Sequence, residues 1–174
     1  MSMPKSYKKN IQHVWTILSS GVSVDQDSNN LTLFNIIDQI VIPRNQLVEM
    51  TIATGEKKPA APVGFVLVSQ WRKLQDNTDA NGEVKVELLD PDGIMRQGAE
   101  YQINLPGKIE RFRSRVQWGG VRVTTSGMYT FKISLKEEGQ DEFVPVGEAY
   151  LKIQIVEDVA KKKKINVKVR KRIK

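Results

Sequence analysis

The chain has 174 residues, of which 40% are hydrophobic and 27% are charged. This composition excludes wholesale disorder and fits one domain with a single core. No apolar run approaches the roughly 18 residues of a membrane helix, and polar residues interrupt the segment after the basic N-terminus, so we expect no signal peptide. The absence of cysteine excludes disulfides and thiolate metal sites, and it favours a cytoplasmic location.

The net charge of +7 is unevenly distributed along the chain. Residues 1–160 contain 18 Lys or Arg against 20 Asp or Glu, a net charge of −2, whereas residues 161–174 carry +9. Such density is typical of an interaction segment or a solubilising end. We therefore expect a flexible N-terminus at 1–9, a single folded domain at 10–158 and a basic C-terminal tail at 159–174.

The first half of the chain is rich in strand-forming residues. Residues 13–24 contain many β-branched and aromatic side chains, the polar cluster at 25–30 follows, and a second apolar run covers 31–42. Two such runs around an Asp/Asn/Ser cluster predict a hairpin or a corner. The best candidate for a short helix is 44–50, residues 53–63 have the composition of a loop, and 64–73 predict another strand.

The second half of the chain alternates more clearly. In "EVKVELLD", Val84, Val86 and Leu88 share one face of a strand, with charged residues on the other. "DPDG" predicts a turn. Further strand-like runs cover 94–104, 109–118, 121–125, 127–136 and 143–156. About eight to ten strands with regular turn signals predict an all-β fold, a two-layer antiparallel β-sandwich.

Two stretches resemble known β-sandwich families. "SGMYTFKISL", residues 126–135, resembles a late strand of an immunoglobulin-like or C2-like sandwich, in which Tyr129 and Phe131 would both face the core. The opening unit, residues 13–40, resembles the start of an uncharacterised family of bacterial β-sandwich proteins. These resemblances imply a fold and bring no activity, substrate or catalytic residue.

No arrangement of residues in the sequence indicates catalysis. The single histidine, His13, lies in an apolar strand-like run, where a packed or edge position is the usual role. No nucleophile elbow, phosphate-binding loop, dinucleotide fingerprint or zinc-helix motif is present. We expect a protein that is not an enzyme, uses no cofactor and has no small-molecule substrate.

Aspartates gather in the predicted turns, and they are weak candidates for calcium ligands: Asp25, Asp27, Asp90 and Asp92. C2-like sandwiches bind calcium through loops at one end, where several carboxylates converge. The alternative is that these residues only form turns, for which Asp is well suited. We therefore assign no metal site from the sequence.

Three arginines recur at period two in "ERFRSRVQW". In a strand, Arg111, Arg113 and Arg115 project from one face and the intervening residues from the other. One interpretation pairs them across strands with the glutamates of "EVKVE", or leaves them solvated. The other interpretation is an anion-binding stripe for phosphate or nucleic-acid backbone. The three tryptophans, at 15, 71 and 118, are expected to pack in the core or on a sheet.

The tail combines charge with a strand pattern. Ile165, Val167 and Val169 alternate with polar residues, and all three are β-branched. We hypothesise that residues 165–173 add as an edge strand to this chain or to a neighbouring subunit. Its exposed basic face, which would also suit an anion or nucleic acid, consists of Lys168, Arg170 and Arg172.

Three functions follow from these features. The first is a non-enzymatic interaction or assembly module with a protein partner or a second copy of itself. The second is a nucleic-acid-associated protein that binds phosphate backbone in a salt-dependent way. The third, least favoured, is a module for calcium-dependent or anionic-membrane binding.

Overall fold

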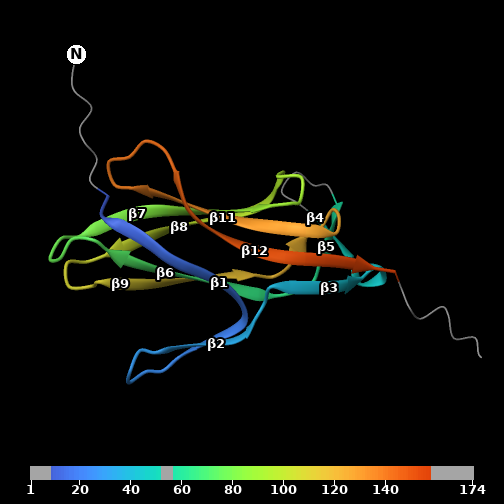
Figure 1. Cartoon of the computed structure of the whole chain (residues 1–174), viewed down its shortest axis with the longest axis horizontal. Helices are drawn as coiled ribbons and strands as arrows, with labels where there is room; N and C mark the ends of the chain where they lie inside the picture. The colour runs from blue at the N-terminus through green and yellow to red at the C-terminus, as the bar shows by residue number, and fades with distance from the viewer. Residues whose placement is uncertain (1–8, 52–56, 158–174) are drawn as a thin grey trace, which may run out of the picture.

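The structure, a computed structural model, describes residues 9–51 and 57–157, and most of them lie in strands (Figure 1). The helical content of this described part is a single three-residue turn, η1 (Arg44–Gln46), so no helix there could cross a membrane. The strands are β1 (Ile11–Val24), β2 (Leu31–Ile36), β3 (Gln39–Pro43), β4 (Val48–Thr51), β5 (Lys57–Ala61), β6 (Phe65–Lys73), β7 (Ala80–Leu89), β8 (Met95–Leu105), β9 (Arg111–Trp118), β10 (Val121–Arg122), β11 (Gly127–Glu137) and β12 (Val144–Val156).

Two large sheets form the layers of a β-sandwich. The four-stranded sheet has the order β2-β1-β6-β9, and all of its pairs are antiparallel. The five-stranded sheet has the order β3-β12-β11-β7-β8, in which only the β3–β12 pair is parallel. A small third sheet, β10-β5-β4, extends one end. The predicted all-β sandwich is confirmed, with nine strands in its two main layers.

The core lies between the inner faces of the two large sheets. Val84, Val86 and Leu88 of β7 are completely buried, as their alternation predicts. Phe131 of β11 packs edge-to-face on Phe65 of β6, with the ring centroids 5.8 Å apart, and this pair ties one layer to the other. Burial of each such side chain is worth about 1.5–3 kcal/mol, and this packing is the main source of stability.

Tyr129, at the start of β11, fixes the chain where it enters this strand. Its ring is completely buried, and its hydroxyl donates to the carbonyl of Thr125 at 2.9 Å and accepts from the N–H of Thr124 at 3.0 Å. This is the arrangement of the tyrosine corner of immunoglobulin-like sandwiches. Phe131 is also fully buried, so the expectation that both aromatic residues face the core is confirmed.

Gly127 begins β11 because a larger residue does not fit there. A Cβ atom at this position would lie 2.5 Å from Cγ of Pro91, far inside van der Waals contact. Pro91 belongs to the predicted "DPDG" turn between β7 and β8, where Gly93 has a φ of +76°. The turn and the glycine together allow the β7–β8 connection to approach the start of β11 closely.

Two local expectations are wrong, and a third is confirmed with one difference. The region 53–63 contains strand β5, whose Ala60 and Ala61 are completely buried and pair with β10. The helix expected at 44–50 is only the turn η1, followed by strand β4. The hairpin expected around the polar cluster at 25–30 is confirmed by β1 and β2. The apolar run at 31–42, however, forms two strands in different sheets, because the chain breaks near Asn35, where φ is +48°, and crosses from β1 to β12.

Candidate anion-binding surface

The predicted arginine row lies on the outer face of the four-stranded sheet. Arg111 and Arg115 are exposed and Arg113 is half-buried, whereas Ser114 and Trp118 of the same strand are buried. The predicted alternation of faces in β9 is therefore confirmed. The register with β6 places Arg72 directly beside Arg111, which adds a fourth guanidinium that the pattern of β9 alone does not reveal.

The pairing of these arginines with glutamates of "EVKVE" is wrong, whereas solvation, the other alternative, agrees with the exposure of Arg111 and Arg115. Those glutamates lie on β7 in the five-stranded sheet, whereas β9 is paired with β6 in the other layer. Within residues 9–51 and 57–157, no ion pair involves Arg111, Arg113 or Arg115. A row of like charges at this spacing is electrostatically unfavourable by itself, so an incoming anion gains energy from it.

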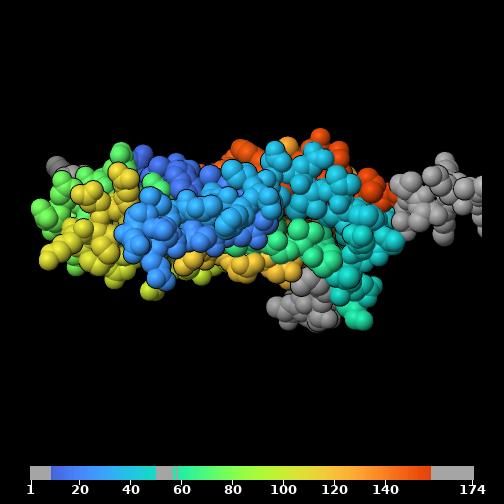
Figure 2. Space-filling model, turned by 90° about the horizontal axis from the view of Figure 1, so that it is seen from below, coloured from blue at the N-terminus to red at the C-terminus, as the bar shows by residue number. Residues whose placement is uncertain are grey.

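The β1–β2 hairpin turns back over this outer face. In Figure 1 the hairpin leaves the end of β1 and runs back beneath the sheet, and Figure 2, which is seen from below, shows it in blue in front of the other strands. Val66 and Val68 point outward from β6, yet they are 9% and 0% exposed. The overlying hairpin accounts for this burial.

The turn of the hairpin reaches the arginine row. Nη1 of Arg113 donates to the carbonyl oxygen of Asn29 at 2.7 Å. Asn29 is held in the left-handed region, at a φ of +54°, by a turn that the Asp25 carboxylate closes with bonds to the N–H and hydroxyl of Ser28. The backbone of the hairpin thus orients one arginine of the row.

A groove runs between the hairpin and β9. We call it the hairpin groove, and its lining residues are Ser20, Gly21, Val22, Val66, Arg115 and Gln117. Its apolar floor, its polar hairpin backbone and the guanidinium of Arg115 provide both contact area and donors for a carboxylate or phosphate oxygen. Arg115 belongs to both the groove and the arginine row, and we call the two together the arginine face.

The outer face of the five-stranded sheet is also charged, but its charges neutralise one another. Lys136 contacts Glu83 at 2.8 Å and Lys85 contacts Glu87 at 3.0 Å. The hydrogen bond to Glu87 raises the pKa of Lys85 above its ordinary value. The two outer faces of the sandwich therefore differ in kind, and the unbalanced one carries the arginines.

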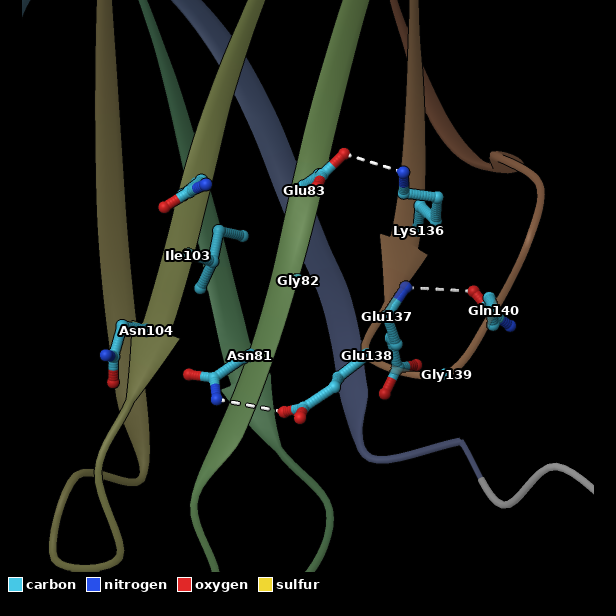
Figure 3. A pocket seen from close by; sticks show the side chains of 11 residues that line it. Asn81, Gly82, Glu83, Ile103, Asn104, Lys136, Glu137, Glu138, Gly139 and Gln140 are labelled. Atoms are coloured by element: carbon cyan, nitrogen blue, oxygen red, sulfur yellow. Dashed lines mark hydrogen bonds and ion pairs between the residues drawn. The ribbon is translucent and has the colours of Figure 1, made fainter.

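A polar cavity at one end of the five-stranded sheet lies between β7, β8 and β11 (Figure 3). Its side chains bond to one another, with Nδ2 of Asn81 at 3.0 Å from Glu138 and the N–H of Glu137 at 2.9 Å from Oε1 of Gln140. The Glu137 carboxylate accepts the backbone N–H groups of Asn10 and Ile11 at 2.8 and 3.0 Å. These acidic residues have structural roles, so the cavity is not the candidate site.

Two of the four aspartates proposed as weak calcium ligands, Asp25 and Asp90, are engaged within their own turns. Asp25 bonds to Ser28, which lowers the pKa of its carboxyl group. Burial favours a higher pKa for Asp90, but the N–H of Ile94 and the guanidinium of Arg96 lower it below its ordinary value. Within residues 9–51 and 57–157, no group of three or more His, Cys, Asp or Glu side chains could hold a metal ion. Asp27 and Asp92 therefore belong to no such group.

The remaining residues singled out in the sequence are the histidine, the three tryptophans and the basic residues of the tail. His13 is half-buried and packs edge-on against Trp71, with 5.0 Å between the ring centroids, and its Nε2 is 2.7 Å from Oγ1 of Thr16. Trp71 and Trp118 are core residues, whereas Trp15 is half-buried beside Gln70 on the arginine face. The tail residues Lys168, Arg170 and Arg172 lie outside the described residues.

Comparisons with known proteins give a fold-level likeness at most. No protein-family model and no curated protein sequence matches the chain. One solved structure that is similar is the CARDB domain of a Pyrococcus furiosus protein, in complex with di-metal ions. The TM-score is 0.35 and the sequence identity is 9%, and the match covers 88% of this chain and 99% of the CARDB chain. The CooA pilin subunit of enterotoxigenic Escherichia coli has a TM-score of 0.31 at 7% identity, with 85% and 99% covered.

Proposed function

We propose that this protein is a non-enzymatic interaction module that binds an anionic segment of a partner protein on its arginine face. The observation that carries the proposal is the difference between the two outer faces of the sandwich. Lysines and glutamates neutralise each other on the five-stranded sheet, whereas Arg111, Arg113 and Arg115 have no ion-pair partner among the described residues. Surface charge that has no counter-charge nearby in the same protein favours the binding of an oppositely charged partner.

Nucleic-acid binding is the alternative function, and the same surface chemistry supports it in part. Arginine contacts to phosphate would give strongly salt-dependent affinity. Base stacking needs exposed aromatic platforms among the basic residues, but on β9 the aromatic residues point inward from the arginines. The aromatic residue that does lie on this face, Trp15 beside Gln70, is half-buried and offers a smaller platform. A protein partner therefore fits the face better, and we keep the nucleic acid as an outcome of the test.

The test compares two triple variants of the full chain. The first is R111Q/R113Q/R115Q, and its control is K85Q/K132Q/K136Q, which removes the same charge from strands of the opposite face. Binding to poly-L-glutamate, to a short DNA duplex and to anionic vesicles is measured at low and at moderate salt, and melting temperatures show that each variant folds. A further full-length variant has the nine basic tail residues replaced by Gln.

We expect the arginine variant to bind poly-L-glutamate about tenfold more weakly, which corresponds to about 1.4 kcal/mol. The lysine control should stay close to the parent. Equal binding by both triple variants would overturn the proposal. Arginine-dependent binding to DNA that exceeds the binding to poly-L-glutamate would replace it with the nucleic-acid function, and arginine-dependent binding to vesicles alone would replace it with a membrane-surface function.

A further inference from the structure

We propose that the free edge of β9 receives an extended acidic segment of a partner protein as an additional strand. This inference rests on the proposed function and specifies how the partner is held. In the order β2-β1-β6-β9, β9 is the last strand, so among the described strands nothing pairs with its outer edge. The N–H and C=O groups on this edge form a template for one more strand.

The edge of β9 opens into a groove that can hold the inward side chains of such a strand. This edge groove lies between β8 and β9 and is lined by residues 99–101 and 112–117. Tyr101, Phe112 and Val116 line it, are partly buried and pack against the core. The hydroxyl of Tyr101 is bonded to Oγ of Ser114 at 2.8 Å, so the floor of the groove is fixed in place.

The two sides of β9 set different requirements on the incoming strand. Successive side chains of a strand point to opposite faces of a sheet. Those on the inner side would enter the edge groove beside Phe112 and Val116, and those on the outer side would lie next to Arg113 and Arg115. The structure therefore assigns the partner an alternating apolar and acidic sequence, about as long as the eight residues of β9.

The other charges around the edge do not change this assignment. Glu100 borders the edge groove, but it is exposed and its register partner on β7 is Lys85. Glu110 precedes the arginine row, and Asp25 and Asp27 lie in the hairpin turn beyond it, yet none of them forms an ion pair with the row in the described residues.

Charge also decides between possible occupants of the edge. A second copy that paired through its own β9 would place two arginine rows side by side, which is repulsive. The basic tail of this chain, with nine positive and no negative residues from 161 to 174, would meet the same repulsion. An acidic segment from another protein is the occupant that the charge of this edge favours.

The probe is the capped octapeptide Val-Glu-Val-Glu-Val-Glu-Val-Glu, with its binding to the full chain measured by fluorescence or calorimetry. Two further peptides carry N-methyl groups, one on all the valines and one on all the glutamates. In a strand, alternate N–H groups point to opposite edges, so only one of the two sets can face β9. A scrambled peptide of the same composition controls for charge.

We expect one methylated peptide to lose binding by about tenfold or more and the other to retain it, and the scrambled peptide to bind more weakly than the alternating one. Equal binding by both methylated peptides, whether retained or lost, would overturn strand addition. If poly-L-glutamate binding still depends on the arginines in that case, the proposed function stands and only this inference fails. Loss of the arginine dependence would remove the proposed function itself.

Discussion

Arg113 on β9 donates to the carbonyl oxygen of Asn29 in the β1–β2 turn, and so joins an edge strand to a hairpin from another part of the sequence. The bond is solvent-accessible, so its contribution to the free energy of unfolding is small, about 0.5–1.5 kcal/mol at most. Its main effect is on the position of the hairpin over the arginine face.

We expect Arg113→Ala to increase hydrogen exchange in the turn, measured at residues 25–30, with little change in melting temperature. The amide of Asp25, which donates to the carbonyl of Asn30 at 2.9 Å, reports on this opening. Arg115→Ala removes a neighbouring guanidinium and should leave exchange in the turn unchanged. Exchange that is the same in the parent and in Arg113→Ala would show that the bond does not hold the hairpin.

Glu137 holds the start of β1 against the end of β11. It is 5% exposed, and its carboxylate accepts two backbone N–H groups, those of Asn10 and Ile11. Because hydrogen bonds to a charged group are strong and the donors would be left without a partner, Glu137→Ala should destabilise the fold by about 2–4 kcal/mol in urea unfolding. The control is Glu138→Ala, at an exposed neighbour, which should cost less than about 1 kcal/mol.

The hydroxyl of Tyr129 makes the tyrosine corner. In Tyr129→Phe, the ring remains in the core, but the carbonyl of Thr125 and the N–H of Thr124 lose their partner. We expect a loss of about 1–3 kcal/mol in the free energy of unfolding. Tyr150→Phe, at a residue that is 55% exposed, should leave the melting temperature unchanged. Equal effects of the two substitutions would contradict a special role for the corner.

The single histidine predicts a pH dependence. Burial lowers the pKa of His13, and the nearby Lys9 acts in the same direction, while the carbonyls of Val146 and Trp15 oppose it. The unfolded chain therefore binds a proton at a higher pH than the folded chain does. The stability that depends on neutral His13 is present above about pH 6.5 and is lost as the pH falls below that value.

The measurement is urea unfolding of the parent and of His13→Gln between pH 8 and pH 5. The difference in stability between the parent and the variant should decrease as the pH falls through about 6.5. A difference that stays constant over this range would show that His13 does not control the pH dependence. The chain contains no other histidine, so no second imidazole titrates in the same range.

The tail hypothesis remains a prediction, because residues 158–174 lie outside those described. If residues 165–173 add as an edge strand, deletion of 161–174 will lower the melting temperature or change the oligomeric state. A truncated protein that keeps both properties would exclude the added strand. It would leave the tail as a basic segment that acts only through its charge.

The face of the sheet to which each side chain points could be predicted from the sequence, because alternation is a local property of a strand. Val84, Val86 and Leu88 on the inside, and the arginines of β9 on one outer face, follow from period two alone. Which strands become neighbours is not local. The glutamates expected beside the arginines belong to the other sheet, and Arg72 entered the site through pairing between β6 and β9.

Two further features depend on tertiary contacts, and only the second has a signal in the sequence. Ala60 and Ala61 look like loop residues by composition, and they are fully buried because their small side chains fit where β5 pairs with β10. The hairpin over the arginine face had one sequence signal. Phe65, Val66, Leu67 and Val68 form an unbroken apolar run, which indicates a strand covered on both faces.

The parallel pairing of β3 with β12 has a consequence for the order in which this chain folds. Gln39 pairs with Lys152, and within the described strands β3 has no partner other than β12. During synthesis from the N-terminus, β3 must therefore wait until almost all of the sandwich has emerged from the ribosome. Pairing between such distant segments is slow to form, so we expect β3 to join its sheet late in folding.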